Sequence, residues 1–274
     1  MSMEKELVSK VIENADGVAL QAYKDGLQRT VKPLGDILSF FPRTLRIAFS
    51  GWEKWLTNRE ESLRLTAEAI EEKVKQIPDE KIVEPETYIA IPAIQQLSYS
   101  QNSSDLRELY ANLLVSSMNI DKKWMVHPAF VDIIKQLTPD EARIINKVGS
   151  FKNNFLPLID VKGVVKGDKG EGHQLLITNF TTFGFDVIEN KESICSYVDN
   201  LVRLNLFEIP PSYHLVDNKL YDALEQNPVL AKLSKPYQTI YDLSYNHKIL
   251  VISNLGLQFK RVCCQGAGVD KKSM

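Results

Sequence analysis

The spacing of apolar residues changes near residue 150, and this change constrains the fold of the chain more than any other feature. Up to Val148, apolar residues recur every three or four positions, as on one face of an α-helix. From Asn154 onward they form short runs that glycines interrupt, which is typical of strands and turns. A length of 274 residues exceeds that of one ordinary domain. We therefore expect two modules in a chain that is mainly α, and α+β overall.

Three helices are predicted in the middle of the chain. The first carries apolar residues at positions 106, 109, 110, 113 and 114, behind Ser103, which suits a helix start. The second begins at Pro128 and turns Phe130 inward. A third begins at Thr138, because the Thr138 hydroxyl and the Glu141 carboxylate can cap each other's backbone N–H groups.

Three further helical segments are predicted earlier, over residues 4–32, 38–55 and 58–76. The first presents mainly small residues on one face, and the third repeats apolar residues like the inner positions of a coiled coil. Both seams suit a second helix, so we expect a homo-oligomer. Pro78, Pro85 and Pro92 then predict an extended connector, with helices resuming near Pro92.

The second half of the sequence predicts a winged-helix-like module. Apolar runs at residues 156–165 and 175–178 flank a glycine-rich turn and read as strands. A helix is expected over Ser193 to Leu204, followed by antiparallel strands at Leu206 to Ile209 and Lys248 to Ile252. Ser253 then caps a last helix. The expected organisation is an N-terminal helical module over 1–136, a winged-helix-like C-terminal module over 137–264 and a disordered tail over 265–274.

Composition indicates a protein of the cytoplasm. A formal net charge of -2 provides no global positive field toward nucleic acid, so specific nucleic-acid binding is not expected. The cysteines at 195, 263 and 264 are too few and too uneven for a disulfide framework. The start of the chain is acidic where a signal peptide would be basic, and no apolar run reaches the length of a membrane span.

Three phrases of the sequence resemble the abortive-infection alpha family. They run from Asp105 to Met118, from His127 to Glu141 and from Leu255 to Cys263, and His127, Pro128 and Phe130 belong to the second. The resemblance implies a bacterial protein of phage defence, in which infected cells halt or die. It implies no catalytic residues, so we expect a non-enzymatic protein without cofactor that acts by assembly and by binding.

A Mg-dependent nuclease is the weaker alternative. Pro139-Asp140 and Asp160-Val161-Lys162 fit the spacing of a motif in which two carboxylates hold Mg²⁺ and a lysine steadies the phosphate. Asp140 lies in a helix cap, however, where the motif needs the end of a strand. The four histidines are scattered and lack zinc-site spacing. We therefore expect no catalytic or metal residues, and expect His127 to bond to nearby backbone at its helix entrance.

A DNA-binding winged-helix regulator is the second alternative. The predicted recognition helix and its flanks offer Glu189, Lys191, Glu192, Asp199 and Arg203, which together are slightly acidic. A major-groove reader needs Lys and Arg to replace the counterions of the phosphates. The charge pattern therefore favours a scaffold or protein-binding role.

The candidate surface is the amphipathic segment between Leu38 and Trp55. Its apolar face carries aromatic anchors, and cationic side chains lie off that face, as in helices at a membrane interface. The candidate residues are Phe41, Arg43, Arg46, Trp52, Lys54 and Trp55. The same face suits burial in a helical core. If it is exposed, it binds a protein partner or an anionic membrane surface, with the protein peripheral to the inner membrane.

Overall fold

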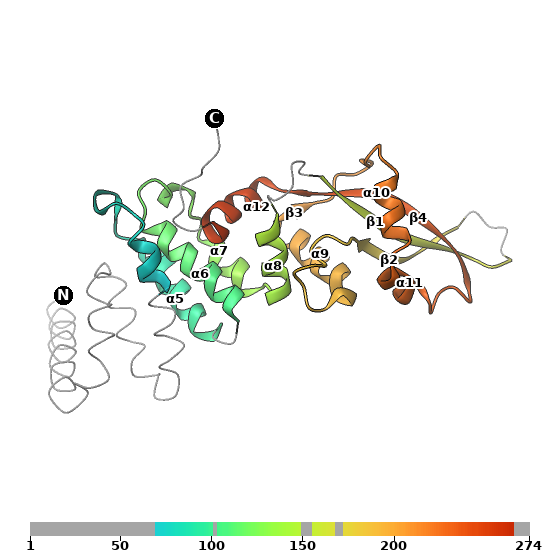
Figure 1. Ribbon diagram of the computed structural model, residues 1–274, viewed down its shortest axis with the longest axis horizontal. Coiled ribbons are helices and arrows are strands. Elements are labelled where there is room, and N and C mark those ends of the chain that lie inside the picture. Colours follow the sequence, from blue (N-terminus) through green and yellow to red (C-terminus); the bar gives the residue numbers. More distant parts are fainter. Residues whose placement is uncertain (1–68, 101–102, 149–154, 168–171, 266–274) are drawn as a thin grey trace, which may run out of the picture. The chain divides into compact units, whose positions relative to one another are not determined.

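A computed structural model describes residues 69–100, 103–148, 155–167 and 172–265 of the chain (Figure 1). Contacts divide the chain into two compact units, Met1–Glu71 and Glu72–Met274, and the second is described here. The predicted helices over 4–32 and 38–55, and most of 58–76, lie outside the described residues, as does the tail from 266. The module boundary at 136/137 stays a prediction.

The first half of the second unit is helical. It contains η2 (Asp79–Lys81), α5 (Thr87–Tyr99), α6 (Ser104–Ser117), η3 (Lys123–Met125), α7 (Ala129–Lys135) and α8 (Pro139–Lys147). The three helices predicted here are confirmed. Ser103 Oγ accepts from the N–H of Leu106 at the start of α6. At the start of α8, Thr138 Oγ1 accepts from Glu141 N at 3.3 Å, and Glu141 Oε2 accepts from Thr138 N at 2.6 Å.

The expected connector around the three prolines is only partly right. Helix α5 begins at Thr87, so Pro92 lies inside it and helices do not resume there. A proline inside a helix removes one backbone hydrogen bond. The apolar face of α5 compensates, since Ile89, Ala93 and Leu97 are buried in the helical core. Ahead of α5, the chain forms η2 and a bridge between Ile82 and Asn119.

The second half is built around one antiparallel sheet of order β2-β1-β4-β3. Its strands are β1 (Phe155–Val165), β2 (Gln174–Phe180), β3 (Phe207–Glu208) and β4 (Tyr241–Ile252). The predicted helix is confirmed as α9 (Ile194–Arg203), preceded by η4 (Lys191–Ser193). The predicted antiparallel pair is confirmed too, because Phe207 lies opposite Ile252. The α+β class is therefore correct.

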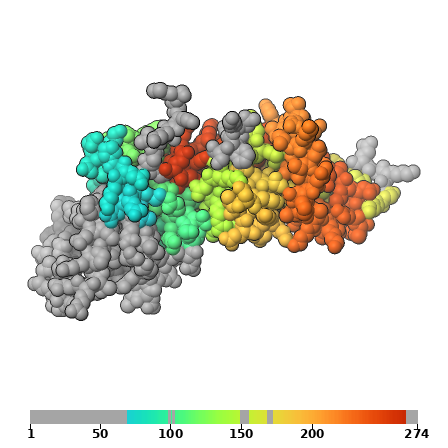
Figure 2. Space-filling view, in the orientation of Figure 1, coloured from blue at the N-terminus to red at the C-terminus, as the bar shows by residue number. Residues whose placement is uncertain are grey.

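Two further features complete the sheet half: the length of β4 and a helical insertion between β3 and β4. β4 begins at Tyr241, seven residues before the predicted strand, and pairs with all of β1 from Val251 back to Tyr241. Between β3 and β4 the chain inserts α10 (Lys219–Glu225) and α11 (Pro228–Ser234). Figure 2 shows this insertion (orange) beside the surface of α9 (gold).

The end of the described chain returns to the helical half. The helix α12 (Asn254–Phe259) continues into the π-helical segment η5 (Lys260–Cys264), which packs against α6. Asn112 Nδ2 of α6 donates to the carbonyl of Cys263 at 2.9 Å. Ser116 Oγ donates to the carbonyl of Val262 at 2.8 Å. Within the described ranges, no helix is long and apolar enough to cross a membrane.

Candidate functional site

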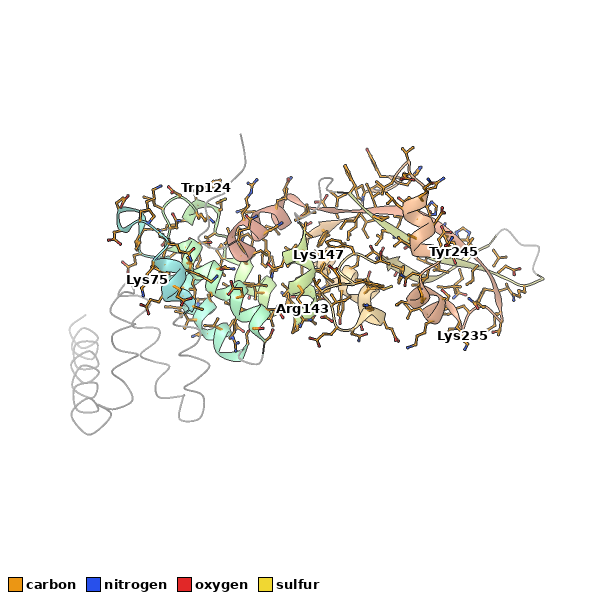
Figure 3. All side chains as sticks on the ribbon, in the orientation of Figure 1. Lys75, Trp124, Arg143, Lys147, Lys235 and Tyr245 are labelled. Atoms are coloured by element: carbon orange, nitrogen blue, oxygen red, sulfur yellow. The ribbon has the colours of Figure 1, made fainter. Side chains whose placement is uncertain are left out.

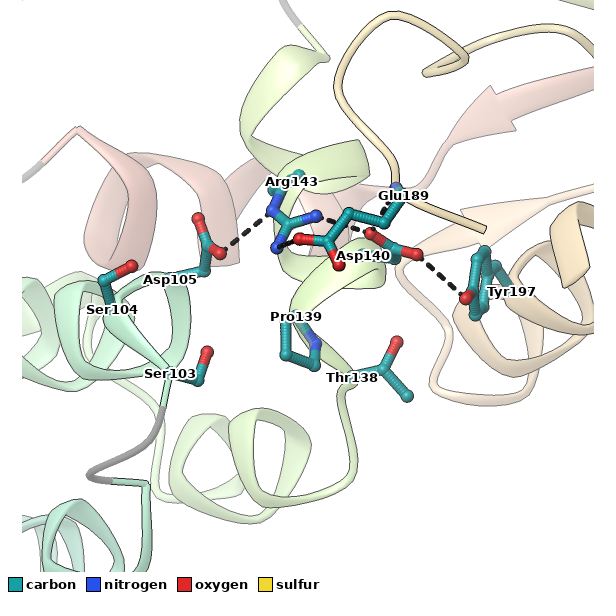
Figure 4. A pocket seen from close by; sticks show the side chains of 9 residues that line it. All are labelled: Ser103, Ser104, Asp105, Thr138, Pro139, Asp140, Arg143, Glu189 and Tyr197. Atoms are coloured by element: carbon teal, nitrogen blue, oxygen red, sulfur yellow. Dashed lines mark hydrogen bonds and ion pairs between the residues drawn. The ribbon is translucent and has the colours of Figure 1, made fainter. Parts of the chain in front are cut away.

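The most connected polar cluster of the described chain surrounds Arg143, in the second turn of α8 (Figure 4). Its guanidinium meets three carboxylates. Nε lies 2.9 Å from Asp105 Oδ2, Nη1 lies 2.6 Å from Asp140 Oδ1, and Nη2 lies 2.9 Å from Glu189 Oε1. These partners come from α6, from α8 and from the segment before α9. Arg143 therefore joins the helical half to the sheet half.

Asp140 is the buried member of this cluster, and both of its carboxylate oxygens are occupied. Oδ1 accepts from Arg143 and from the N–H of Glu189, and Oδ2 accepts from the N–H of Asn190 and from the Tyr197 hydroxyl at 2.9 Å. Burial by itself would raise the pKa of Asp140, but these N–H and O–H donors and Arg143 outweigh it and lower that pKa. The Asp140 carboxylate therefore stays ionised and has no free lone pair for a metal.

A pocket of about 320 Å³ opens beside this cluster. Its lining residues are Ser103, Ser104, Asp105, Thr138, Pro139, Asp140, Arg143, Glu189 and Tyr197. Three carboxylates against one guanidinium leave the pocket with a negative balance, which opposes the entry of a phosphate. Arg143 already binds a carboxylate at each nitrogen. The cluster therefore holds α6, α8 and the segment before α9 together.

The residues of the nuclease alternative do not share a site. Asp160 of β1 is buried and pairs with Lys248 Nζ at 2.6 Å, and its Oδ1 accepts from the N–H of Asn179. Asp140 shares none of these partners. Lys162 lies further along β1, opposite Leu175 and Ser244. Among the described residues, no group of three or more His, Cys, Asp or Glu side chains is arranged to hold a metal ion.

His127 performs the local role that its position predicts. Its Nδ1 accepts from the N–H of Ala129 at 3.1 Å, at the entrance of α7. Pro128 caps that helix, and Phe130 is buried edge-on against Phe259 of α12, with ring centroids 5.3 Å apart. Together with the α6 to η5 hydrogen bonds, this contact brings the three family-like phrases into one packed cluster.

The cysteines are all free, and none is prepared to act as a nucleophile. Burial raises the pKa of the Cys195 thiol to about 12, and the nearby Asp199 adds to the rise. Burial also raises the pKa of Cys264 to about 12 and that of Cys263 well above its usual range. A reactive cysteine needs a lowered pKa, whereas these thiols stay protonated at neutral pH.

An exposed apolar groove lies on the helical half, and the sequence patterns did not predict it. Trp124 of η3 is 76% exposed, Tyr88 of α5 is 60% exposed and Ile120 is 54% exposed. The groove measures about 440 Å³ and is lined by Glu86, Tyr88, Ile89, Ile120, Lys123, Trp124 and Val126. We call it the Trp124 groove; Figure 3 labels Trp124. A tryptophan that directly follows the charged stretch Asp121 to Lys123 was the one available signal.

The geometry of the groove holds Trp124 in place. Its indole Nε1 donates to the carbonyl of Asp121 at 2.9 Å, so the polar atom is satisfied and the ring faces remain available. Lys123 pairs with Glu86 at 2.8 Å, and Lys81 pairs with Asp121 at 2.7 Å. Lys123 and Glu86, the two charged residues that line the groove, therefore balance each other. The other candidate surface, Phe41, Arg43, Arg46, Trp52, Lys54 and Trp55, lies outside the described residues.

Comparison with known proteins places most of the chain in a family. A family model described as abortive infection alpha matches residues 58–263. A solved structure of an uncharacterized protein from the hydrocarbon-degrading marine bacterium Alcanivorax borkumensis SK2 is similar at 18% identity, with a TM-score of 0.33, over 52% of this chain and 94% of that one. No curated protein matches the chain.

Proposed function

The chain belongs to the abortive infection alpha family, and from that premise we propose that it is a non-enzymatic bacterial defence protein that acts by binding a partner protein. The process is the one that the family description names, in which an infected cell stops growth before the phage can spread. We assign the binding of this partner, which triggers or carries out the growth arrest, to the Trp124 groove.

The exposure of Trp124 carries this proposal. Large aromatic side chains dominate the energetics of protein interfaces, and a tryptophan that is 76% exposed is a strong candidate for such an anchor. Burying a side chain of this size contributes up to about 3 kcal/mol to binding. Tyr88 and Ile120 add exposed apolar surface to the same groove.

The charge balance of the groove favours apolar side chains of a protein over a lipid surface. An anionic membrane attracts clusters of unpaired Lys and Arg. Here Lys123 and Lys81 are paired with Glu86 and Asp121. A partner that presents two or three apolar side chains fits this neutral rim.

The pairing of the buried acids supports a role without catalysis. The carboxylate of Asp140 accepts four hydrogen bonds, and Asp160 is paired with Lys248. A catalytic carboxylate needs a free lone pair that faces a substrate. The ion pairs and hydrogen bonds of these groups instead join α6, α8 and the elements around α9.

We also propose that the sheet half contains a winged-helix-like core. The connectivity α9-β3-β4 and the strand order β1-β4-β3 support it. The added strand β2 and the α10–α11 insertion depart from a simple wing. The exposed side of α9 offers Asp199 and Arg203, and Glu192 beside it pairs with Lys232 of α11. This surface lacks the positive excess of a DNA reader, so a scaffold role is favoured.

The amphipathic segment over 38–55 remains a second proposed contact, either with a partner or with the inner membrane from the cytoplasm. Its aromatic anchors and its cations, Arg43, Arg46 and Lys54, suit an anionic surface. Binding to anionic liposomes at low salt, weakened at high salt, is the expected result. The seams at 4–32 and 58–76 are proposed for self-association.

Phage infection of cells that carry the gene tests the main proposal. Culture survival, membrane integrity and nucleic-acid cleavage are followed together. Trp124→Ser should abolish protection without lowering the melting temperature, because the side chain packs little. Tyr213→Ser, which alters an aromatic residue of the sheet half that is 64% exposed, is the matched control and should protect fully. If the purified protein cut nucleic acid with Mg²⁺ and Asp140→Ala or Asp160→Ala stopped the cutting, the proposal would be wrong.

A further inference from the structure

A separate pocket lies where α5, α6 and α7 meet. The three helices pack against one another in pairs (Figure 1). The pocket measures about 210 Å³ and is formed by the end of α5, the start of α6 and the last turn of α7. Its lining residues are Gln96, Ser100, Ser103, Leu106, Tyr110, Ile134 and Lys135. None of them lines the Trp124 groove, so the two sites are distinct.

The floor of this pocket is apolar. Tyr110 and Ile134 are fully buried, and Leu106 is half-buried beside them. The Tyr110 hydroxyl donates to the carbonyl of Val131 at 3.3 Å, so its polar atom already has a partner inside the protein. A ligand that reaches this floor therefore needs an apolar part.

The rim of the pocket offers hydrogen-bond donors. Within the described ranges, no hydrogen bond or ion pair involves the Lys135 ammonium or the side-chain amide of Gln96. The Ser103 hydroxyl accepts from the N–H of Leu106, and its own proton has no acceptor in the described part of the chain. An ammonium has three donors and no acceptor. The rim therefore favours a ligand group that accepts hydrogen bonds.

The charge of the pocket is positive, because Lys135 lines it and no carboxylate does so among the described residues. Asp132, one turn earlier on α7, does not line the pocket, and Asp105 is held by Arg143. The pocket beside Arg143 shares Ser103 with this one and has the opposite charge balance (Figure 4). Lys135 also suits the end of α7, where the helix dipole favours a cation, and its N–H donors stay available there.

We propose that this pocket binds a small monocarboxylate with a short apolar tail. The carboxylate accepts from Lys135, Gln96 and Ser103, and the tail covers Leu106 on the apolar floor. At about 30 Å³ for each water-sized group, the pocket holds about seven non-hydrogen atoms, the size of pentanoate. This site is independent of the Trp124 groove and of the partner protein proposed for it.

Titration of the isotope-labelled full chain with pentanoate, followed by nuclear magnetic resonance, tests the site. The backbone N–H signals of Leu106 and Lys135 should shift and saturate, while the indole N–H signal of Trp124 stays in place. From acetate to pentanoate, each added methylene should strengthen binding by up to about fourfold, the effect of about 0.8 kcal/mol per buried CH₂. The absence of a saturable shift at these two residues would overturn the proposal.

Two further probes separate the charge of the ligand from its tail. Pentanamide has the same size without the charge, and should bind at least about tenfold more weakly than pentanoate. Inorganic phosphate has charge without a tail, and should also bind more weakly. Equal affinity for pentanamide would contradict the role of Lys135, and equal affinity for phosphate would contradict the apolar floor.

A pair of lysine variants assigns the charge to one side chain. Lys135→Gln should weaken pentanoate binding about tenfold and leave the melting temperature nearly unchanged, because this exposed side chain has no partner among the described residues. Lys235→Gln removes an exposed lysine of the sheet half, labelled in Figure 3, and is the matched control that should bind like the unaltered chain. Unchanged binding in Lys135→Gln, or equal weakening in both variants, would mean that this pocket is not the site.

Discussion

The helical half of the second unit and the far end of its sheet differ in how far their apolar side chains are buried and their polar groups are paired. Around α6, α8 and α12, large apolar side chains are buried and the charged groups of the Arg143 cluster pair with one another. Toward Tyr241, β4 leaves apolar side chains exposed and its outer backbone edge open. The core between these helices is closed, whereas the far end of the sheet leaves apolar side chains uncovered. This difference places most of the buried, stabilising contacts in one region and exposed apolar side chains in the other.

Removal of one core ring should have the largest effect on stability. Phe130→Ala deletes a fully buried ring that packs on Phe259, and should lower the free energy of unfolding by about 3 to 5 kcal/mol. Val165→Ala, at the exposed end of β1, should change it by less than about 0.5 kcal/mol. Urea denaturation of both variants measures the contrast. Equal losses would show that the sheet end is as tightly packed as the helical core.

A methyl group at Gly256 should be nearly as harmful. A Cβ atom there would lie 2.1 Å from the backbone oxygen of Leu206, which cannot move without shifting β3. We expect Gly256→Ala to cost about 3 kcal/mol in a thermal melt. Gly172→Ala is the control, because its Cβ would meet nothing within 4 Å. An unchanged melting temperature for Gly256→Ala would mean that α12 and β3 are not held as closely as described.

The charge of Asp140 should contribute stability that depends on pH. Asp140→Asn should lose about 2 kcal/mol at neutral pH, because one oxygen becomes a donor that faces N–H and O–H groups. The folded pKa of Asp140 is lowered, so its contribution is present above the unfolded pKa of about 4 and is lost as pH falls through the folded pKa. The difference between wild type and Asp140→Asn should therefore shrink below about pH 4. Asp242→Asn, on the exposed part of β4, is the control and should leave the free energy of unfolding at neutral pH nearly unchanged.

The smallest expected effect concerns the start of α8. Thr138→Ala removes the hydroxyl that accepts from Glu141 N and should cost about 1 kcal/mol. Thr138→Ser keeps an oxygen acceptor and should restore most of that loss. Melting temperatures of the two variants give the comparison. Identical losses for both would assign the effect to the methyl group of Thr138 and not to the cap.

Much of the local structure followed from the sequence alone. The α6 stripe and the Thr138 to Glu141 cap were predicted correctly, since each depends on neighbours a few residues away. The antiparallel pairing of β3 with β4 joins residues far apart in the chain, and it was predicted from the order of the elements. Pro92 is the exception, because burial of the α5 face outweighed the local preference of a proline.

Tertiary structure alone decided which residues act together. Arg143 meets Asp105 and Glu189, which are 38 and 46 residues away, and no spacing rule predicts such a meeting. The exposure of Trp124 and the open edge of β4 depend on what the rest of the chain leaves uncovered. Apolar periodicity and helix caps act within one element, so the sequence by itself determined elements such as α6, α8 and α9. Contacts between elements depend on how their faces pack, and the folded structure settled them.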